Sequence, residues 1–316
     1  MKVLANDGIS QSGIDTLTKA GFEVLTVQVA QEQLQNYINK HKITVLLVRS
    51  ATQVRKDIID NCPSLKIIGR GGVGMDNIDV DYAIENGINV INTPAASSES
   101  VAELVFAHLF GSVRFLHDSN RNMPLDGDTR FKDMKKNYGG GRELRGKTLG
   151  IVGFGRIGRQ VAKIALGCGM KVIASDHQVG EADITLDFYD GQKITLKIKT
   201  APVDELIKHS DFISLHVPSQ SGYLIGKEEI SKMKNGVGIV NAARGGILNE
   251  KALLDAIEDG KVSFAALDVF ENEPTPSIKV LMNEKISLTP HIGAATNEAQ
   301  DRIGTELANQ IISILG

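Results

Sequence analysis

The sequence predicts an α/β protein that contains two doubly wound parallel sheets. Short apolar runs alternate with amphipathic stretches along most of the 316 residues, which is the pattern of strands connected by crossover helices. This alternation occurs in two series that a long helical stretch separates, and a chain of this length suits about two domains. The second series opens with a glycine-rich turn between an apolar run and a helix, an arrangement that places a ligand at the sheet edge.

The first series of elements extends from the N-terminus to Asn92. Its strands are apolar runs rich in β-branched residues, and its helices carry apolar residues at intervals of three and four. We expect strands at Lys2–Asn6, Phe22–Val27, Ile43–Val48, Lys66–Gly69 and Ile88–Asn92, and helices at Gln11–Ala20, Gln31–Lys40, Val54–Asn61 and Val80–Asn86.

A long helix is predicted to follow the first series. Thr93-Pro94 interrupts the preceding element, and Ser97 or Ser98 is placed to cap a helix from Val101 to about Leu116. This helix is long enough to form a contact between domains or subunits. Its apolar face includes Val101, Leu104, Val105, His108 and Leu109.

The second series combines further strands and helices with one hairpin. In residues 182–200, apolar and polar residues alternate on both sides of Asp190-Gly191, which is a strong two-residue turn. We interpret this hairpin as a structural insertion, with a contact surface as the alternative. The other expected elements are strands at Thr148–Val152, Lys171–Ser175, Phe212–Val217, Val237–Asn241, Phe264–Val269 and Ile286–Thr289, and helices at Ile157–Leu166, Val203–His209, Lys227–Lys234, Asn249–Asp259 and Thr296–Leu315.

The most informative motif is G-x-G-x-x-G, which occupies residues 153–158 between a strand and a helix. Gly153 permits a tight turn, Gly155 lets the backbone approach a pyrophosphate, and Gly158 lets the helix pack close to the strand. The N–H groups at the helix start then face the anion. The next apolar run ends in Asp176, where a carboxylate accepts hydrogen bonds from the adenosine ribose of NAD and repels the 2′-phosphate of NADP. The sequence therefore predicts a Rossmann domain that binds NAD.

Two Thr-Pro pairs bracket the second series. Thr93-Pro94 precedes it and Thr289-Pro290 follows it, as the two strands of a hinge would, although Thr-Pro is common enough for coincidence. We expect a discontinuous, flavodoxin-like substrate-binding domain made of residues 1–93 and 291–316. Residues 94–290 then form the inserted NAD-binding Rossmann domain.

Composition excludes several classes of function. The net charge is −3 and no long basic run is present, which argues against a nucleic-acid surface. No leader sequence opens the chain and no apolar stretch approaches the roughly 18 residues that span a bilayer, so we expect a cytoplasmic protein without membrane contact. Cys62 and Cys168 lack metal-type spacing and are expected to be buried reduced thiols, and no metal site is predicted.

Three charged side chains come within a few residues of strand ends in the second series: Arg244, Glu273 and His291. The carboxyl ends of parallel strands meet at one edge of a sheet, so these side chains are expected to converge beside the dinucleotide. Taken singly, they also fit a surface ion pair, a solvated loop acid and a capping histidine. Their common placement favours an active site.

Several stretches of both series resemble the D-isomer-specific 2-hydroxyacid dehydrogenases. They are GFGRIG, HVP, NAARGG, ALDVFENEP and TPHIG, and the resemblance covers almost the whole chain. Within that family, VRSAT and GRGGVGMDNIDV, at residues 48–52 and 69–80, are most similar to the phosphoglycerate dehydrogenases. The resemblance implies an NAD-dependent oxidoreductase that oxidises D-3-phosphoglycerate to 3-phosphohydroxypyruvate at the start of serine biosynthesis. We also expect a homodimer. The chain stops after the helix expected to return to the first domain, so we expect no appended regulatory domain.

The resemblance implies a role for each of the three charged residues. Arg244 clamps the substrate carboxylate, His291 exchanges the hydroxyl proton, and Glu273 orients and charges His291. Physical chemistry agrees, because a planar guanidinium holds a carboxylate by two parallel bonds. An imidazole that titrates near neutrality also suits a proton relay.

The resemblance also implies a set of cofactor contacts. Asp268 is expected to bond the nicotinamide amide, with a cap of the following turn as the alternative. His216 is expected to be a wall residue rather than an acid or base. Together with the residues of the glycine motif and Asp176, the predicted cofactor-binding residues are Gly153, Gly155, Arg156, Ile157, Gly158, Asp176, His216, Val217, Pro218, Ala242, Ala243, Arg244, Asp268, His291, Gly293 and Ala294.

Substrate selectivity is expected to depend on the first series. Arg49 and Arg70 follow separate strands and together can neutralise a phosphate, with interdomain ion pairs as the alternative. Lys135 and Lys136 lie near the place where phosphoglycerate dehydrogenases bring in a basic side chain from a second subunit, but the loop at residues 120–142 resembles them poorly. The predicted substrate-binding residues are Arg49, Ser50, Arg70, Gly72, Val73, Gly74 and Arg244.

Two alternative functions stay open at this point. A glyoxylate or hydroxypyruvate reductase would use the same mechanism on a substrate without a phosphate. An NAD-sensing scaffold of the corepressor type would retain the same residues without steady turnover.

Overall fold

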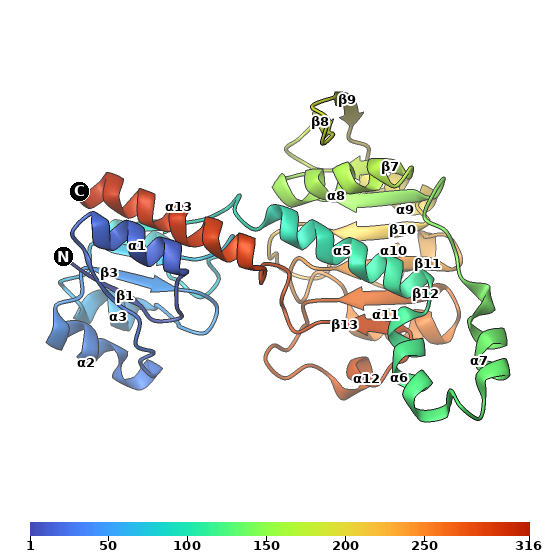
Figure 1. Cartoon of the computed structure of the whole chain (residues 1–316), viewed down its shortest axis with the longest axis horizontal. Coiled ribbons are helices and arrows are strands. Elements are labelled where there is room, and N and C mark those ends of the chain that lie inside the picture. The colour runs from blue at the N-terminus through green and yellow to red at the C-terminus, as the bar shows by residue number, and fades with distance from the viewer. The chain divides into compact units, whose positions relative to one another are not determined.

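The computed structural model describes all 316 residues. The chain forms two compact units, each built on one parallel sheet with flanking helices (Figure 1). Unit 1 comprises Met1–Ser100 and Ala294–Gly316, and unit 2 comprises Val101–Gly293. These boundaries lie seven and three residues after those expected at 93 and 290, so the first one falls within helix α5 (Ser98–Val113).

The sheet of unit 1 is fully parallel, with the strand order β2-β1-β3-β4-β5. This is the flavodoxin-like order that the sequence predicts. The final helix α13 (Asn297–Leu315) lies alongside α1 (Gln11–Lys19) (Figure 1). The other elements are β1 (Lys2–Ala5), β2 (Glu23–Leu25), β3 (Val45–Val48), β4 (Ile67–Arg70), β5 (Asn89–Asn92), α2 (Gln31–His41), α3 (Lys56–Asn61) and α4 (Val80–Glu85).

Apolar side chains cover both faces of this sheet, and each face has its own core. Val3 and Val45 belong to the core that includes Leu307 of α13. Leu4 and Leu46, their neighbours in sequence, belong to the core on the opposite face. Burial on both faces explains why these strands are nearly continuous apolar runs.

Unit 2 contains a six-stranded parallel sheet with the order β13-β12-β11-β10-β6-β7. One isolated parallel bridge joins Ala174 of β7, the edge strand, to Thr200. The strands are β6 (Thr148–Val152), β7 (Lys171–Ser175), β10 (Phe212–Leu215), β11 (Val237–Asn241), β12 (Val262–Leu267) and β13 (Ile286–Leu288). The helices of this unit that follow β6 are α8 (Arg156–Gly167), α9 (Val203–His209), α10 (Lys227–Lys232), α11 (Glu250–Glu258) and α12 (Ile278–Leu281).

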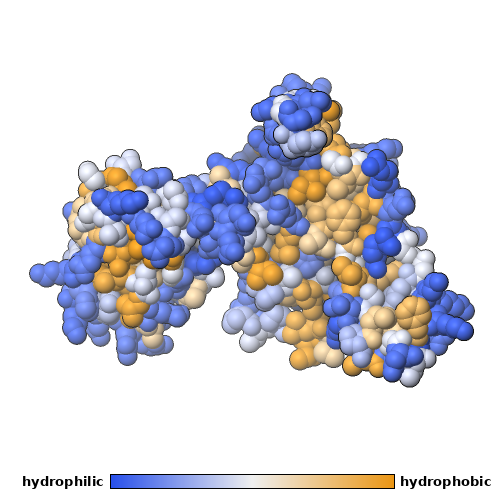
Figure 2. Space-filling view, viewed as in Figure 1, coloured by the Kyte–Doolittle hydropathy of each residue, from blue (hydrophilic) through white to orange (hydrophobic).

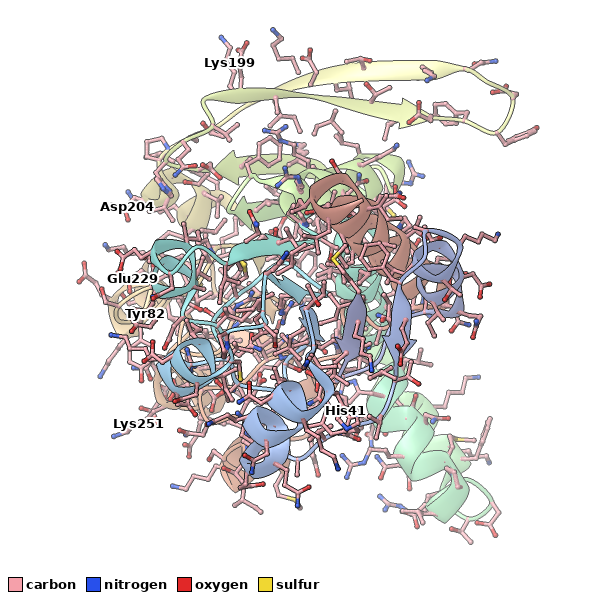
Figure 3. All side chains as sticks on the ribbon, turned by 90° about the vertical axis from the view of Figure 1, so that its left-hand side faces the viewer. His41, Tyr82, Lys199, Asp204, Glu229 and Lys251 are labelled. Carbon is pink, nitrogen blue, oxygen red and sulfur yellow. The ribbon has the colours of Figure 1, made fainter.

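The predicted hairpin is confirmed as an antiparallel pair, β8 (Glu181–Asp187) and β9 (Lys193–Lys199). Ile184 is buried in the same core as Val161 of α8, which attaches the hairpin to the unit. Its visible surface is mostly hydrophilic in Figure 2, and in Figure 3 Lys199 points outward near its base. The hairpin is thus anchored on one side by Ile184 and presents hydrophilic side chains on the other.

Two expectations about the middle of the chain are wrong. Helix α5 spans Ser98–Val113 instead of the expected Val101 to about Leu116, so it begins and ends about one turn earlier; of the two predicted caps, Ser97 directly precedes the helix and Ser98 is its first residue. The expected loop at residues 120–142 contains much of α6 (Leu116–Asp126), α7 (Phe131–Asn137) and the short helix Tyr138–Gly140. Hydrogen bonds of the Tyr138 hydroxyl with Asp118 and Asn122 tie these helices together despite Pro124.

The cysteines agree with the expectation only in part. Both thiols are free, and Cys62 is buried, where burial raises its pKa to about 11. Cys168 is partly exposed. None of the helices combines the length and apolarity that a bilayer crossing requires.

Candidate active site

Glu273 and His291 form the centre of the candidate site in unit 2. Glu273 lies in the segment after β12, and His291 follows β13, the neighbouring strand. Nδ1 of His291 is 2.8 Å from Oε2 of Glu273. Oε1 of Glu273 accepts the backbone N–H of Phe270 at 3.0 Å, which fixes the carboxylate. The structure therefore brings together two of the three predicted catalytic side chains.

Asp268 holds the turn that carries His291. The side chain is buried, and Oδ1 accepts the Thr289 hydroxyl at 2.7 Å and the N–H of Ile292 at 2.8 Å, while Oδ2 accepts the N–H of Gly293 at 2.9 Å. These bonds support His291, whose φ of 54° is uncommon for a residue with a side chain. They are the contacts of a capping residue, the alternative interpretation of Asp268. The carboxylate retains further acceptor capacity, and its contact with nicotinamide stays a prediction.

Arg244 lies in the loop after β11. The Asn241 amide shapes this loop, because it donates to the Arg244 carbonyl at 2.9 Å and accepts the N–H of Ala243 at 3.1 Å. Gly245 packs so closely on the Phe270 carbonyl that a Cβ atom would overlap it. The loop of Arg244 is thus in contact with the turn that carries Glu273.

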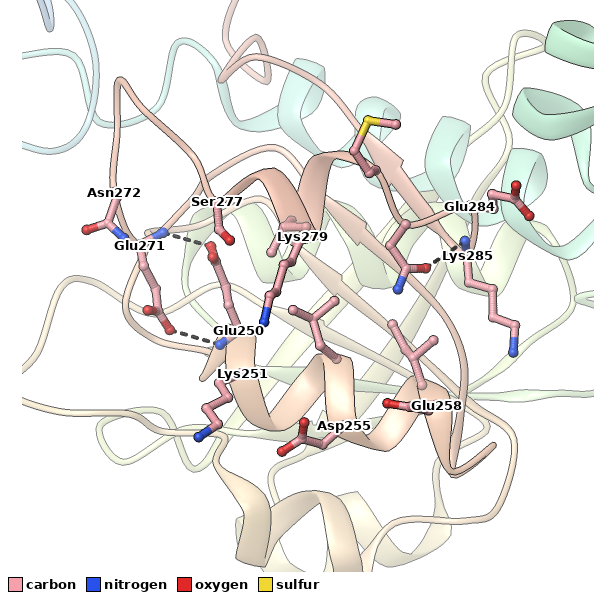
Figure 4. A pocket seen from close by; sticks show the side chains of 15 residues that line it. Glu250, Lys251, Asp255, Glu258, Glu271, Asn272, Ser277, Lys279, Glu284 and Lys285 are labelled. Carbon is pink, nitrogen blue, oxygen red and sulfur yellow. Dashed lines mark hydrogen bonds between the residues drawn. The ribbon is translucent and has the colours of Figure 1, made fainter.

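A pair of carboxylates, Glu250 and Glu271, also fixes the turn that carries Glu273. The N–H of Glu271 donates to Oε1 of Glu250, and the N–H of Glu250 donates to Oε1 of Glu271, both at 2.8 Å (Figure 4). Glu250 is buried at the start of α11, and burial together with the charge of Glu271 raises its pKa. Sequence reasoning missed this pair, because two acidic residues 21 positions apart give no local signal.

The glycine turn after β6 has the shape that a dinucleotide phosphate requires. Gly153 has a φ of +94°, and a Cβ at Gly158 would overlap the Gly153 carbonyl. The space beside Gly155 is open, and no side chain caps the start of α8. Because a bulky residue would close this cradle, the turn fits the pyrophosphate of NAD.

Asp176 follows β7 beside this turn. Its carboxylate accepts the N–H groups of Phe154 at 2.7 Å, Gln178 at 2.8 Å and Val179 at 3.1 Å. Burial opposes ionisation of this group, but the three hydrogen bonds outweigh it and lower the pKa of Asp176. The carboxylate is therefore a fixed negative charge at the position predicted for the adenosine ribose.

His216 packs against the same turn from the end of β10. A Cβ on Gly153 would overlap its carbonyl, and its Nε2 is 2.7 Å from the Ser214 hydroxyl. Burial lowers the pKa of His216 to about 3, so the ring is neutral near pH 7. This agrees with a wall residue. At the same edge of the sheet, Val217 and Pro218 follow β10 and Ala242 and Ala243 follow β11.

The predicted phosphate residues lie in unit 1 at the carboxyl edge of neighbouring strands. Arg70 is the last residue of β4, rather than following it, and pairs with Val48 of β3, the residue before Arg49. The Arg70 guanidinium lies over Gly72, where a Cβ atom would overlap it; Gly72 also has a φ of +148°, which favours glycine. The structure therefore brings Arg49, Arg70 and the glycine turn to one edge.

Asp7 shapes this edge and was missed by the sequence reasoning. Its carboxylate accepts the N–H of Arg49 at 2.6 Å and both the N–H and the hydroxyl of Thr52. Asn77 donates to the carbonyl of Arg49 at 2.7 Å. An acid directly after the first strand was the available signal. Ala294 also falls in unit 1, apart from the other predicted cofactor residues.

The comparisons with known proteins agree on one family. Residues 106–293 match the profile described as D-isomer specific 2-hydroxyacid dehydrogenase, NAD binding domain. The chain is 44% identical to a hydroxypyruvate reductase of Thermotoga maritima over 321 residues, which covers 100% of this chain and 98% of the relative. It is 40% identical over 317 residues to a D-3-phosphoglycerate dehydrogenase of Methanocaldococcus jannaschii, with 100% of this chain covered but only 57% of the relative. The chain thus spans about half the length of the phosphoglycerate dehydrogenases that it matches.

Solved structures lead to the same result. The TT0316 protein of Thermus thermophilus has a TM-score of 0.86 at 28% identity and covers 100% of this chain and 97% of its own. A glyoxylate reductase of Paecilomyes thermophila has a TM-score of 0.81 at 31% identity, with coverage of 99% and 94%. The chain belongs to the D-isomer-specific 2-hydroxyacid dehydrogenases, a family of NAD-dependent oxidoreductases.

Proposed function

We propose that this enzyme oxidises D-3-phosphoglycerate to 3-phosphohydroxypyruvate with NAD, the first step of serine biosynthesis. The observation that carries the phosphate specificity is the adjacency of Arg49 and Arg70 at one sheet edge in unit 1. Several relatives named D-3-phosphoglycerate dehydrogenase support this reading. We assign the binding of the substrate phosphate to unit 1, and NAD binding together with the residues Arg244, Glu273 and His291 to unit 2.

His291 is the proton acceptor in this proposal. An ionised Glu273 only accepts hydrogen bonds, so the proton between them is on Nδ1 of His291. Nε2 then carries the lone pair that takes the proton of the substrate's 2-hydroxyl group. As His291 becomes an imidazolium, Glu273 stabilises its charge across 2.8 Å. Such general-base assistance typically contributes about 10²- to 10⁴-fold.

Arg244 is the carboxylate clamp. Its guanidinium can hold the substrate carboxylate by two parallel hydrogen bonds, which fixes the orientation of C2. Bound NAD supplies the acceptor for the hydride that leaves C2. The N–H groups of Arg156 and Ile157 at the start of α8 would hold the pyrophosphate, and Asp176 would hold the adenosine ribose and disfavour NADP.

A reductase of hydroxypyruvate or glyoxylate is the second candidate. This candidate is supported by the relative from Thermotoga maritima, which is 44% identical and of which this chain covers 98%, compared with 40% and 57% for the phosphoglycerate dehydrogenase of Methanocaldococcus jannaschii. The chemistry at His291, Glu273 and Arg244 would be the same. Only the contribution of the two arginines of unit 1 differs between the candidates.

We also propose a homodimer in the cytoplasm. Several large apolar side chains of α5, α6 and α7 are exposed, and Figure 2 shows apolar patches at the place of α6. Exposed apolar clusters of this kind mark contacts between proteins. Analytical ultracentrifugation tests this assembly. The exposed side chains are Phe110, Leu116, Leu125 and Phe131.

The assignment of the proton relay is tested with two variants. His291→Ala is expected to lower kcat by about 10²- to 10⁴-fold while NADH binding, measured by fluorescence, stays nearly intact. Glu273→Gln is expected to move the acid limb of the pH–rate profile to lower pH, because the imidazolium loses its counter-charge. Normal turnover of His291→Ala would exclude His291 as the base.

A further inference from the structure

One buried histidine of α5 contacts the strand and turn that lead to His291. His108 is 5% exposed. Its Nδ1 is 2.8 Å from the hydroxyl oxygen of Ser287 in β13, and its Nε2 is 3.0 Å from the hydroxyl oxygen of Thr289. The predicted apolar face of this helix thus contains one polar residue with a partner at each ring nitrogen.

The direction of these hydrogen bonds follows from the chemistry of the partners. The Thr289 hydroxyl has a single proton, which it donates to Oδ1 of Asp268, because an ionised carboxylate only accepts. Nε2 of His108 must therefore donate to Thr289, and Nδ1 accepts the proton of Ser287. Burial lowers the pKa of His108, opposed by the charge of Asp268 and assisted by His117, which agrees with a neutral ring.

The hydrogen bonds continue from Asp268 to the turn of His291. The carboxylate that receives the Thr289 proton also accepts the N–H groups of Ile292 and Gly293, the two residues after His291. The turn has little room to shift, since a Cβ on Gly293 would lie 3.1 Å from Oδ2 of Asp268 and 3.3 Å from the side chain of Val101 in α5. An unbroken series of contacts therefore connects α5 with the backbone at His291.

We propose that His108 is a positioning residue for the proton transfer at His291. As a neutral Nε2–H tautomer it orients the Thr289 hydroxyl toward Asp268, and Asp268 then holds the left-handed turn that aims the His291 ring. His108 touches neither substrate nor cofactor. The inference rests on the proposed role of His291 and adds a residue from a helix outside the three catalytic loops.

The test compares variants of His108 that keep or remove its hydrogen bonds. His108→Leu removes both bonds, whereas His108→Gln offers an amide donor and a carbonyl acceptor. We expect His108→Leu to lower kcat about 10- to 100-fold, because small misplacements of a reacting group are costly. His108→Gln is expected to recover at least part of the loss. Ser112→Ala, a change at a buried hydroxyl of the same helix, is the matched control and is expected to leave kcat within about twofold.

Two further measurements separate positioning from stability. The double variant of His108→Leu with Thr289→Val is expected to lose no more than the worse single variant, because both changes break one series of contacts. NADH binding of the folded fraction is expected to change little. If His108→Leu does not fold, the kcat of Thr289→Val is compared with that of Thr289→Ser. Only serine keeps the hydroxyl between His108 and Asp268, so Thr289→Val is expected to lose activity and Thr289→Ser to retain most of it.

The outcomes distinguish this inference from the proposed function. Full turnover of His291→Ala would overturn the assigned base itself. A large loss in His291→Ala with kcat within about twofold in His108→Leu and Thr289→Val would overturn the positioning role alone. A loss in thermal stability with unchanged kcat per folded enzyme would also overturn it.

Discussion

Replacement of Arg70 by alanine probes the residue that separates the two candidate substrates. Arg70 ends β4 beside Arg49, and its guanidinium lies over the backbone of Gly72. In the proposal, Arg70 binds the phosphate group of a three-carbon acid. The loss on substitution is therefore expected to depend on whether the substrate carries that phosphate.

The expected magnitude follows from one charge-assisted contact. A hydrogen bond to a charged group contributes roughly 1.5 to 3 kcal/mol, and each 1.36 kcal/mol corresponds to about tenfold in rate. Arg70→Ala is therefore expected to lower kcat/KM for D-3-phosphoglycerate by about 10- to 100-fold. For D-glycerate, which lacks the phosphate, we expect a change of less than about threefold.

Steady-state NADH formation with both substrates provides the assay. Arg55→Ala is the matched control in the same unit, because Arg55 forms an exposed ion pair with Asp79 and is expected to leave both substrates unaffected. An equal loss on the two substrates would refute the reasoning. It would mean that Arg70 supports the carboxylate or the fold instead of a phosphate.

Three further predictions concern cofactor choice and stability. Asp176→Asn keeps an acceptor for the backbone but removes the charge, so the ratio of kcat/KM for NAD over NADP is expected to fall; an unchanged ratio would exclude Asp176 as its determinant. The pKa of Glu250 is raised in the folded protein, so its contribution to the free energy of unfolding is complete below its ordinary pKa and is lost as pH rises through its pKa in the folded state. Glu250→Gln is therefore expected to raise Tm at pH 8 but not at pH 4. Glu258→Gln, at an exposed position of the same helix, is the control. The Thr296 hydroxyl caps α13 by accepting the N–H of Ala299. Thr296→Ala removes this cap and is expected to lower the free energy of unfolding, measured with denaturant, by about 1 kcal/mol, whereas Thr296→Ser keeps the hydroxyl and is expected to lower it much less.

The sequence predicts the sheets well because the central strands, such as β3, β10 and β11, are buried along their whole length and are therefore continuous apolar runs. Val237–Asn241 and Val203–His209 are predicted with their observed bounds, since the first is a short apolar run and the second is a short stretch that directly follows Pro202. The same reasoning places Glu273 and His291 together, because residues after neighbouring parallel strands share an edge. Local pattern and topology are sufficient for this part of the site.

What the sequence does not reveal depends on contacts between distant residues. His108 fits an apolar stripe by spacing, and only its partners on β13 and the following turn distinguish it from a core residue. The exchange of hydrogen bonds between Glu250 and Glu271 likewise has no local signature. The helices α6 and α7 were missed because a polar composition and Pro124 imitate a loop.

The most direct test of the central claim is one substrate panel measured on the same enzyme preparation. NADH formation is compared for D-3-phosphoglycerate, D-glycerate and D-lactate at equal NAD concentration. We expect the highest kcat/KM with D-3-phosphoglycerate, by about tenfold or more over D-glycerate, because a charge-assisted phosphate contact contributes at least roughly 1.5 kcal/mol. A preference for D-glycerate would contradict the claim and favour a hydroxypyruvate reductase, and the absence of steady turnover on every acid would favour an NAD-sensing scaffold.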